Sequence, residues 1–135
     1  MILVKTNLGV SKIEGIGLFA NEDIKKGTIV IKNNDNFGIA KYFEEQWKQM
    51  EKELSKESFR QIKKYAYKDK QDGLHCLCLD DTRFINHSKN PNIKTIGDND
   101  VAVRDIEKGE EILIDYTVFC ANEDLENEKY LKIDK

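Results

Sequence analysis

The chain has 135 residues, a length that suits one domain built around a single hydrophobic core. Hydrophobic residues make up 39% of it and charged residues 35%, with one proline, so an intrinsically disordered chain is excluded. The formal net charge of −3 is too small to indicate a partner by itself. No apolar run approaches the roughly 20 residues that a membrane span requires. Residues 1–10 carry no signal-peptide pattern, so we expect an intracellular protein, cytoplasmic or nuclear, without a membrane partner.

The first motif, Gly15-Ile16-Gly17-Leu18-Phe19-Ala20, matches the glycine-rich dinucleotide fingerprint in its alanine-ended form. That fingerprint follows a strand and opens a helix, whereas residues 21–27 are too short and too rich in turn formers for such a helix. Two interpretations therefore stay open. The motif is either a plain turn or a stretch of backbone that a ligand approaches closely, because glycine carries no side chain.

One pattern occurs twice in the chain. The sequence Ala-x-x-Asp-Ile-x-Lys-Gly spans residues 20–27 and returns at 102–109. Each copy has the composition of a polar turn that ends in glycine, and the strands expected after them are Thr28 to Lys32 and Glu111 to Tyr116. Two copies are too few for a solenoid, which needs at least three repeats. The pattern thus predicts one strand-and-turn unit that the fold uses twice.

A helical region is predicted between the two copies. Apolar residues recur there at three- and four-residue steps, which is typical of a helix face, and we interpret this face as core. The first helix carries the face at Ile39, Phe43, Trp47, Met50 and Leu54, and a second, after a break near Ser55, carries it at Phe59, Ile62 and Ala66.

Two hairpins follow the helical region. Asp72-Gly73 is a strong hairpin turn signal, and Leu74 to Leu79 is the strand after it. Residues 97–100 form a second turn, between a strand at Ile93 to Ile96 and another at Val101 to Arg104. Many short strands with one helical insertion predict an α+β fold that is mostly β.

The chain contains three cysteines, Cys76, Cys78 and Cys120. Because a secreted disulfide framework has an even number of cysteines, this odd set favours a reducing compartment. A closed zinc site needs four ligands, usually in close pairs, and here only His75 stands beside Cys76 and Cys78. We therefore expect no metal site and interpret the cysteines as small buried apolar residues.

Two further motifs contain groups suited to chemistry. Residues 83–92, Arg-Phe-Ile-Asn-His-Ser-Lys-Asn-Pro-Asn, place polar side chains and an Asn-Pro turn around His87. Alone they are consistent with a polar loop in which His87 only makes structural hydrogen bonds. Residues 109–116, Gly-Glu-Glu-Ile-Leu-Ile-Asp-Tyr, are an apolar strand that ends in the phenol of Tyr116.

Taken in this order, the three motifs resemble the SET-domain family of protein lysine methyltransferases. The family pattern is Gly-x-Gly-Leu/Val-Phe-Ala, then Arg-Phe-x-Asn-His-Ser-x-x-Pro-Asn, then Gly-Glu-Glu-Leu-x-x-Asp-Tyr, and the resemblance runs from Gly15 to Tyr116. It implies several small twisted sheets, a helical insert at about 37–70, and a C-terminal segment threaded beneath an earlier loop. It also implies a single SET domain over residues 1–135, in a small form without zinc-binding flanking segments and with a tail at 117–135.

The resemblance implies methyl transfer from S-adenosylmethionine to the side-chain amine of lysine in a protein. Tyr116 would be the catalytic residue. Ile114 stands where many relatives carry Tyr or Phe, which leaves open how many methyl groups are added. The cofactor would be held by Asn86 and His87, by the backbone of Ile16, Gly17 and Leu18, by Tyr116 and by Phe119 stacked on adenine, while Tyr65, Tyr67 and Ile114 would line the lysine channel.

Two other functions stay open. The first is a catalytically inactive SET-fold module that binds a peptide, although the presence of Asn86, His87 and Tyr116 argues against it. The second and weaker one is a nicotinamide-dependent oxidoreductase that uses the glycine motif. We also expect residues 117–130 to cover the cofactor, alone or together with a second copy of the chain in a homodimer.

Charge is unevenly distributed along the sequence. Residues 1–71 hold 14 basic and 10 acidic residues, whereas residues 97–128 hold 2 basic and 11 acidic residues. A field of one sign attracts a partner of the opposite charge and repels phosphates of the same charge. We therefore expect the substrate lysine in a basic, flexible segment such as a histone tail, and no direct binding of nucleic acid by the acidic face.

Overall fold

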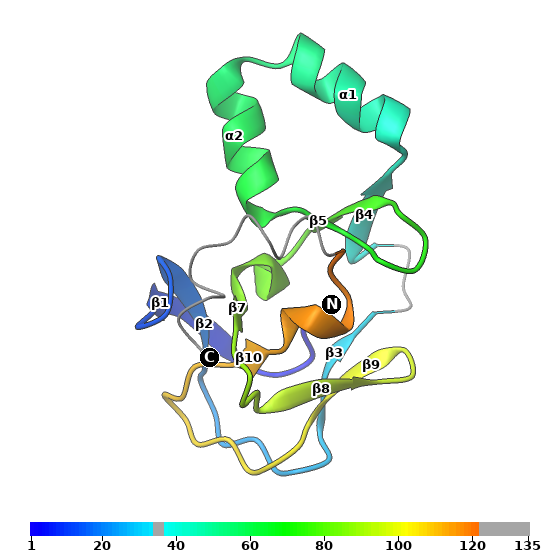
Figure 1. The fold of residues 1–135 in the computed structure, drawn as a ribbon. Coiled ribbons are helices and arrows are strands. Elements are labelled where there is room, and N and C mark those ends of the chain that lie inside the picture. Colours follow the sequence, from blue (N-terminus) through cyan, green and yellow to red (C-terminus); the bar gives the residue numbers. More distant parts are fainter. Residues whose placement is uncertain (34–36, 122–135) are drawn as a thin grey trace.

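The computed structural model describes residues 1–33 and 37–121, and more of these residues lie in short strands than in helices (Figure 1). The helices are α1 (Glu44–Glu53) and α2 (Lys56–Tyr65), with 3-10 turns η1 (Asp81–Phe84) and η2 (Tyr116–Val118). The strands are β1 (Thr6–Val10), β2 (Ile16–Ala20), β3 (Ile29–Lys32), β4 (Ile39–Tyr42), β5 (Tyr67–Lys68), β6 (His75–Cys78), β7 (Asn86–His87), β8 (Ile93–Ile96), β9 (Asn99–Ala102) and β10 (Leu113–Ile114).

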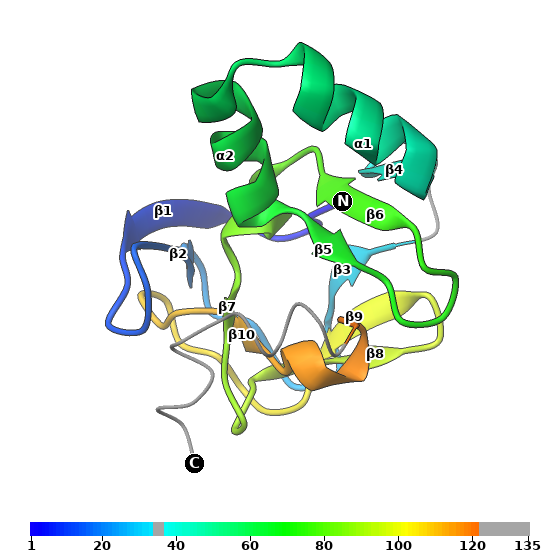
Figure 2. The same cartoon turned by 45° about the horizontal axis from the view of Figure 1, so that its top comes forward.

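The strands form several small sheets rather than one large one. Three sheets are antiparallel, with the strand orders β1-β2, β3-β9-β8 and β4-β6-β5, and the fourth is the parallel pair β7-β10. Figures 1 and 2 show α1 and α2 at one end of the molecule, next to the β4-β6-β5 sheet. The predicted fold class, α+β and mostly β with a helical insertion, is confirmed. Neither helix of the described ranges is long and apolar enough to cross a membrane.

The hydrophobic core lies between the small sheets. Its buried side chains come from β2, β3, β8, β9 and β10 and from the segments that join them. Because no sheet is wide enough to bury a face alone, the core depends on packing between sheets. Its members are Leu18, Ala20, Ile24, Val30, Ile31, Ile85, Ile93, Ala102, Ile106, Ile112 and Ile114.

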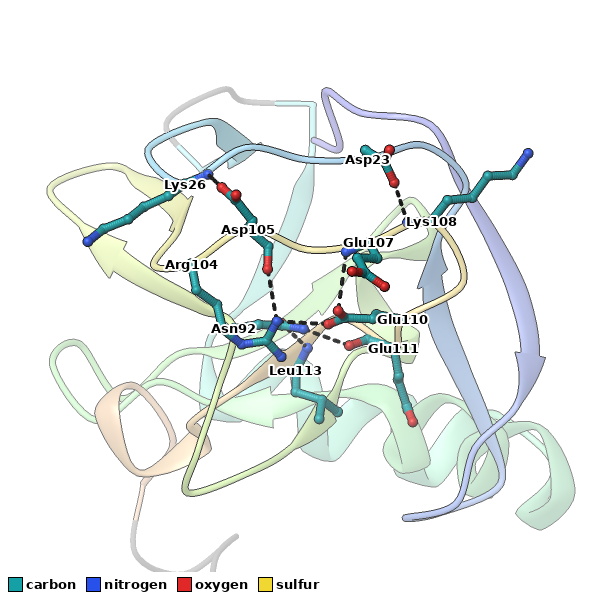
Figure 3. A network of polar contacts seen from close by, with 10 residues as sticks. All are labelled: Asp23, Lys26, Asn92, Arg104, Asp105, Glu107, Lys108, Glu110, Glu111 and Leu113. Carbon is teal, nitrogen blue, oxygen red and sulfur yellow. Dashed lines mark hydrogen bonds and ion pairs between the residues drawn. The ribbon is translucent and has the colours of Figure 1, made fainter.

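The two copies of the repeated pattern pair with each other. Ile24 and Ile106, each at most 2% exposed, exchange two backbone hydrogen bonds of 2.8 Å. Each aspartate of the pattern caps the other copy: Asp105 accepts from the backbone N–H of Lys26 at 2.8 Å, and Asp23 accepts from that of Lys108 at 2.9 Å (Figure 3). The repeat is therefore an internal, nearly two-fold contact that joins the N-terminal and C-terminal halves.

The prediction of a helix beginning at Ile39 is wrong. Residues 39–42 form β4, which pairs antiparallel with β6, and the helix begins only at Glu44. Phe43 is 65% exposed and Leu54 is 37% exposed, so of the predicted face Trp47 alone is fully buried. A four-residue step fits a helix, but here the backbone ladder with β6 decides the conformation of the segment.

The break near Ser55 and both hairpins are confirmed. The hydroxyl of Ser55 accepts from the backbone N–H of Ser58 at 3.1 Å and caps α2. The hairpin β5-β6 turns at Asp72-Gly73, and β8-β9 turns at Gly97, whose φ of +62° favours glycine. This second turn is shorter than predicted, because β9 begins at Asn99 and not at Val101. The strand expected over Glu111 to Tyr116 is shorter than predicted, since only Leu113–Ile114 pairs as β10.

Candidate functional site

The parallel pair β7-β10 brings the second and third motifs together. Leu113 lies beside Asn86 and Ile114 beside His87, so Tyr116 follows directly at the end of this pair. Asn92 is only 1% exposed and holds this segment through two side-chain hydrogen bonds of 2.8 Å (Figure 3). Its Nδ2 donates to the carbonyl of Glu111, and its Oδ1 accepts from the N–H of Leu113. One buried amide thus fixes the register of the segment that carries Tyr116.

Tyr116 is held at two points. Its backbone N–H donates to Nδ1 of His87 at 3.0 Å, and its hydroxyl donates to the backbone carbonyl of Ile85. Because Nδ1 of His87 accepts this bond, the ring is in the tautomer that carries its proton on Nε2. The phenol proton is directed at the carbonyl of Ile85, and a phenol oxygen can act as an acceptor as well as a donor.

Asn86 links this pair to the glycine motif. It is only 7% exposed, and its Nδ2 lies 3.1 Å from the carbonyl of Glu14, 3.3 Å from that of Ile16 and 3.0 Å from Oε1 of Glu111. Its Oδ1 accepts no hydrogen bond from the described part of the chain. With its donors occupied by protein acceptors, Asn86 presents an acceptor, and the Glu111 carboxylate beside it adds negative charge. This face suits a ligand that carries a cationic donor.

Tyr116 also lines a cavity of about 380 Å³. Phe119 packs edge-on against Tyr67 at 5.0 Å between ring centroids and tilts against Tyr116 at 5.8 Å. Burial raises the pKa of the Tyr67 phenol well above its ordinary range, so this wall is uncharged. The apolar and aromatic part of the lining consists of Tyr65, Tyr67, Ile85, Ile114, Tyr116 and Phe119.

The residues singled out from the sequence thus fall into two groups around Tyr116. Tyr65, Tyr67, Ile114 and Phe119 line the cavity together with Tyr116. The second group lies in β2 and β7, which are joined by the hydrogen bond from Asn86 to the carbonyl of Ile16. Its members are Ile16, Gly17, Leu18, Asn86 and His87. Leu18 and His87 are at most 2% exposed as whole residues, so in this structure they support the site from within and present almost no surface to a ligand.

Sequence reasoning missed three residues of this region. Glu111 was part of the apolar strand motif, yet its carboxylate bonds to Asn86. Lys64 and Arg83 line the cavity, Lys64 from the end of α2 and Arg83 from η1. For Glu111 and Arg83 the available signal was their position inside the motifs. For Lys64 no signal existed, because it is one of many lysines in its helix.

The three cysteines are buried, as predicted. Burial raises the pKa of the Cys76 thiol to about 11 and that of Cys78 to about 12, so both stay protonated at neutral pH. Within residues 1–33 and 37–121, no three side chains of the kinds that ligate metals gather at one place.

Comparisons with known proteins show the family of the chain. The family model of the SET domain matches residues 15–117. The Drosophila melanogaster histone-lysine N-methyltransferase trr is 31% identical over 129 residues, an alignment that covers 81% of this chain but only 5% of that much longer relative.

Solved structures share the fold. A Plasmodium falciparum protein described as a histone methyltransferase is 28% identical, with a TM-score of 0.53 over 85% of this chain and 95% of that one. Polycomb Repressive Complex 2 of Chaetomium thermophilum, bound to S-adenosylmethionine, is 26% identical, with a TM-score of 0.58 over 87% of this chain and 16% of that one. Since the family model spans most of its length, the chain belongs to the SET-domain family of lysine methyltransferases.

Proposed function

We propose that the protein transfers a methyl group from S-adenosylmethionine to the side-chain amine of a lysine in a protein substrate. The observation that carries the proposal is the position of Tyr116. Its ring lines the cavity, while its backbone is bonded to His87 in the strand that also holds Asn86. A residue whose side chain lines a cavity, and whose backbone is bonded to a second polar segment, is suited to orient two reactants against each other.

The amine must be neutral to attack. A free lysine has a pKa near 10.4, so deprotonation at pH 7 costs roughly 4–5 kcal/mol. A lysine inserted among Tyr65, Tyr67 and Ile114 would lose hydration, which lowers its pKa. Burial therefore supplies much of the activation, and a strong general base is unnecessary.

The polar face fits the cofactor. S-adenosylmethionine, when bound, supplies an electrophilic methyl group on a sulfonium, and its amino acid part carries an ammonium. Asn86 offers Oδ1 as an acceptor for that ammonium, and Glu111 contributes negative charge nearby. The backbone of Ile16, which is 48% exposed, and of Gly17 completes the face.

Tyr116 is the residue that aligns the reactants. Its hydroxyl donates to Ile85, and its oxygen would accept from the lysine amine and make a weak CH···O contact with the methyl group of the bound cofactor. His87 acts as a positioning residue, because it holds the backbone N–H of Tyr116. Phe119 lies against Tyr116 and Tyr67, and we retain it as a candidate for stacking on adenine.

A basic, flexible protein segment, such as a histone tail, is the substrate class we propose. Residues 97–121 contain 7 acidic residues and only 2 basic ones. Two of the acidic residues, Asp98 and Asp100, line the cavity. The names of trr and of the Plasmodium relative point to histone lysine as well. Most of the tail that we expect to cover the cofactor, alone or in a homodimer, lies outside the described residues.

The test combines binding and turnover. Calorimetry with S-adenosylmethionine and S-adenosylhomocysteine should give saturable binding that Asn86→Ala weakens. Labelled S-adenosylmethionine and a cell lysate, followed by mass spectrometry, should then reveal methylated lysines. The absence of cofactor binding to the wild type would exclude the enzyme. Cofactor binding without turnover on any lysine would favour the inactive peptide-binding module instead.

A further inference from the structure

Two cations line the cavity and form no ion pair within the described residues. Lys64 in the last turn of α2 and Arg83 in η1 both line the cavity. The Nε atom of Arg83 is buried and has no hydrogen-bond partner. Within residues 1–33 and 37–121, neither Lys64 nor Arg83 forms an ion pair.

An aromatic pair separates the two cations. Nζ of Lys64 lies 5.5 Å from the centre of the Tyr65 ring, and the guanidinium carbon of Arg83 lies 5.8 Å from the centre of the Phe84 ring. Tyr65 and Phe84 themselves pack edge to face, with 5.0 Å between their centroids. Both cations therefore lie against the same pair of aromatic rings. Of these rings, Tyr65 lines the cavity together with Tyr116.

The ring contacts do not satisfy Arg83. A cation over an aromatic face gains some electrostatic energy, but the buried Nε–H of the half-buried Arg83 still lacks an acceptor. Buried donors without partners are few in folded proteins, because leaving such a donor unpaired costs free energy. A carboxylate is the group that best matches a guanidinium, because it supplies both the opposite charge and hydrogen-bond acceptors.

We propose that the cation wall, defined as Lys64 and Arg83, binds the carboxylate of an Asp or Glu that flanks the target lysine. The inference rests on the proposed function and adds a sequence requirement to it. Asp98, in the turn between β8 and β9, lines the same cavity. The acidic residue of such a substrate would contact the cation wall, and its basic residues would lie toward Asp98. Because these two contacts differ in sign of charge, the peptide would bind in only one of its two possible chain directions.

The experiment uses the full chain and peptides that contain a single lysine. Each flanking position in turn carries Glu, Gln or phosphoserine, and both kcat/KM and peptide affinity by fluorescence anisotropy are measured. At one position the Glu peptide should exceed the Gln peptide roughly tenfold in both quantities. Lys64→Glu should invert this preference, so that the Gln peptide exceeds the Glu peptide at that position, and Arg83→Gln should remove it. Lys63→Glu is the matched control, because Lys63 is the exposed neighbour that does not line the cavity.

Equal values for Glu and Gln peptides at every position would overturn the inference. So would a Lys64→Glu variant that behaves like Lys63→Glu, or a preference for phosphoserine without one for Glu. Anisotropy separates this result from failure of the proposed function. A protein without turnover that still prefers Glu peptides retains the anion site and refutes methyl transfer, whereas an active protein without the preference refutes only the anion site.

Discussion

The carboxylate of Glu111 fills the space that a side chain at position 17 would need. A Cβ atom built on Gly17 would lie 2.2 Å from Oε1 of Glu111 and 3.1 Å from Cβ of Ser11. The same Oε1 accepts from Nδ2 of Asn86 at 3.0 Å. The second glycine of the motif therefore leaves room for the Glu111 carboxylate, and this carboxylate in turn holds Asn86.

Gly17→Ala should weaken binding of S-adenosylhomocysteine by roughly tenfold, because Glu111 must move and release Asn86. Calorimetry measures the affinity, and thermal unfolding checks that the variant is folded. The double variant with Glu111→Ala supplies the control, since it removes the clash. If Gly17→Ala weakened binding by the same factor in the Glu111→Ala variant as in the wild type, the role given to Glu111 would be contradicted.

Tyr116→Phe should lower kcat at least roughly tenfold while the affinity for S-adenosylhomocysteine changes much less. The ring and its contacts with His87 and Phe119 remain, and the lost hydroxyl is the group that orients the amine. Tyr42→Phe serves as the control because Tyr42 packs on Trp47, away from the cavity. If rate and affinity fell together, Tyr116 would be a binding residue.

Asn92→Ala should reduce the free energy of unfolding by about 2–4 kcal/mol, because it leaves the carbonyl of Glu111 and the N–H of Leu113 without partners. Urea denaturation with an unchanged m-value is the measurement. Asn90→Ala, at an exposed position in the same loop, should change stability little. Equal effects of the two substitutions on the free energy of unfolding would show that the side-chain hydrogen bonds of Asn92 do not stabilise the strand.

The contact between Glu44 and His75 should make stability depend on pH. Oε2 of Glu44 lies 2.6 Å from Nε2 of His75, and this hydrogen bond lowers the pKa of Glu44 below its ordinary 4.5. A lowered carboxyl pKa contributes stability above the unfolded value, and this stability is lost as the pH falls through the folded value. The difference in Tm between wild type and Glu44→Gln should therefore shrink below a pH of about 4. Glu45→Gln, on the neighbouring exposed residue, should show no such change.

Methylation of a basic peptide at subsaturating concentration should slow as salt rises, because exposed charges more than about 8 Å apart are largely screened at 0.15 M. The rate is measured with S-adenosylmethionine saturating. Asp98→Asn should flatten the salt profile, since Asp98 lines the cavity, whereas Glu107→Gln at an exposed position outside it should not. A flat wild-type profile would refute electrostatic attraction of the substrate and leave methyl transfer intact.

Local signals in the sequence were sufficient for the fold class, the family, both hairpins and the break at Ser55. Turn residues such as Asp72-Gly73 determine the conformation of their immediate neighbours, whatever packs around them. The order of three motifs between Gly15 and Tyr116 is also a property of the linear chain, and it was enough to indicate the family that the comparison confirmed.

Packing between distant segments decided the rest. The segment at Ile39 is a strand because β6 lies beside it, and Ile24 pairs with Ile106 although 82 positions separate their numbers. The cation wall exists only because α2 and η1 meet at Tyr65 and Phe84. A periodic pattern reports on neighbours within a few residues, whereas pairing and side-chain contacts depend on which surfaces bury each other. The sequence by itself therefore determined which motifs this protein carries, and only the tertiary structure decided which side chains meet around Tyr116.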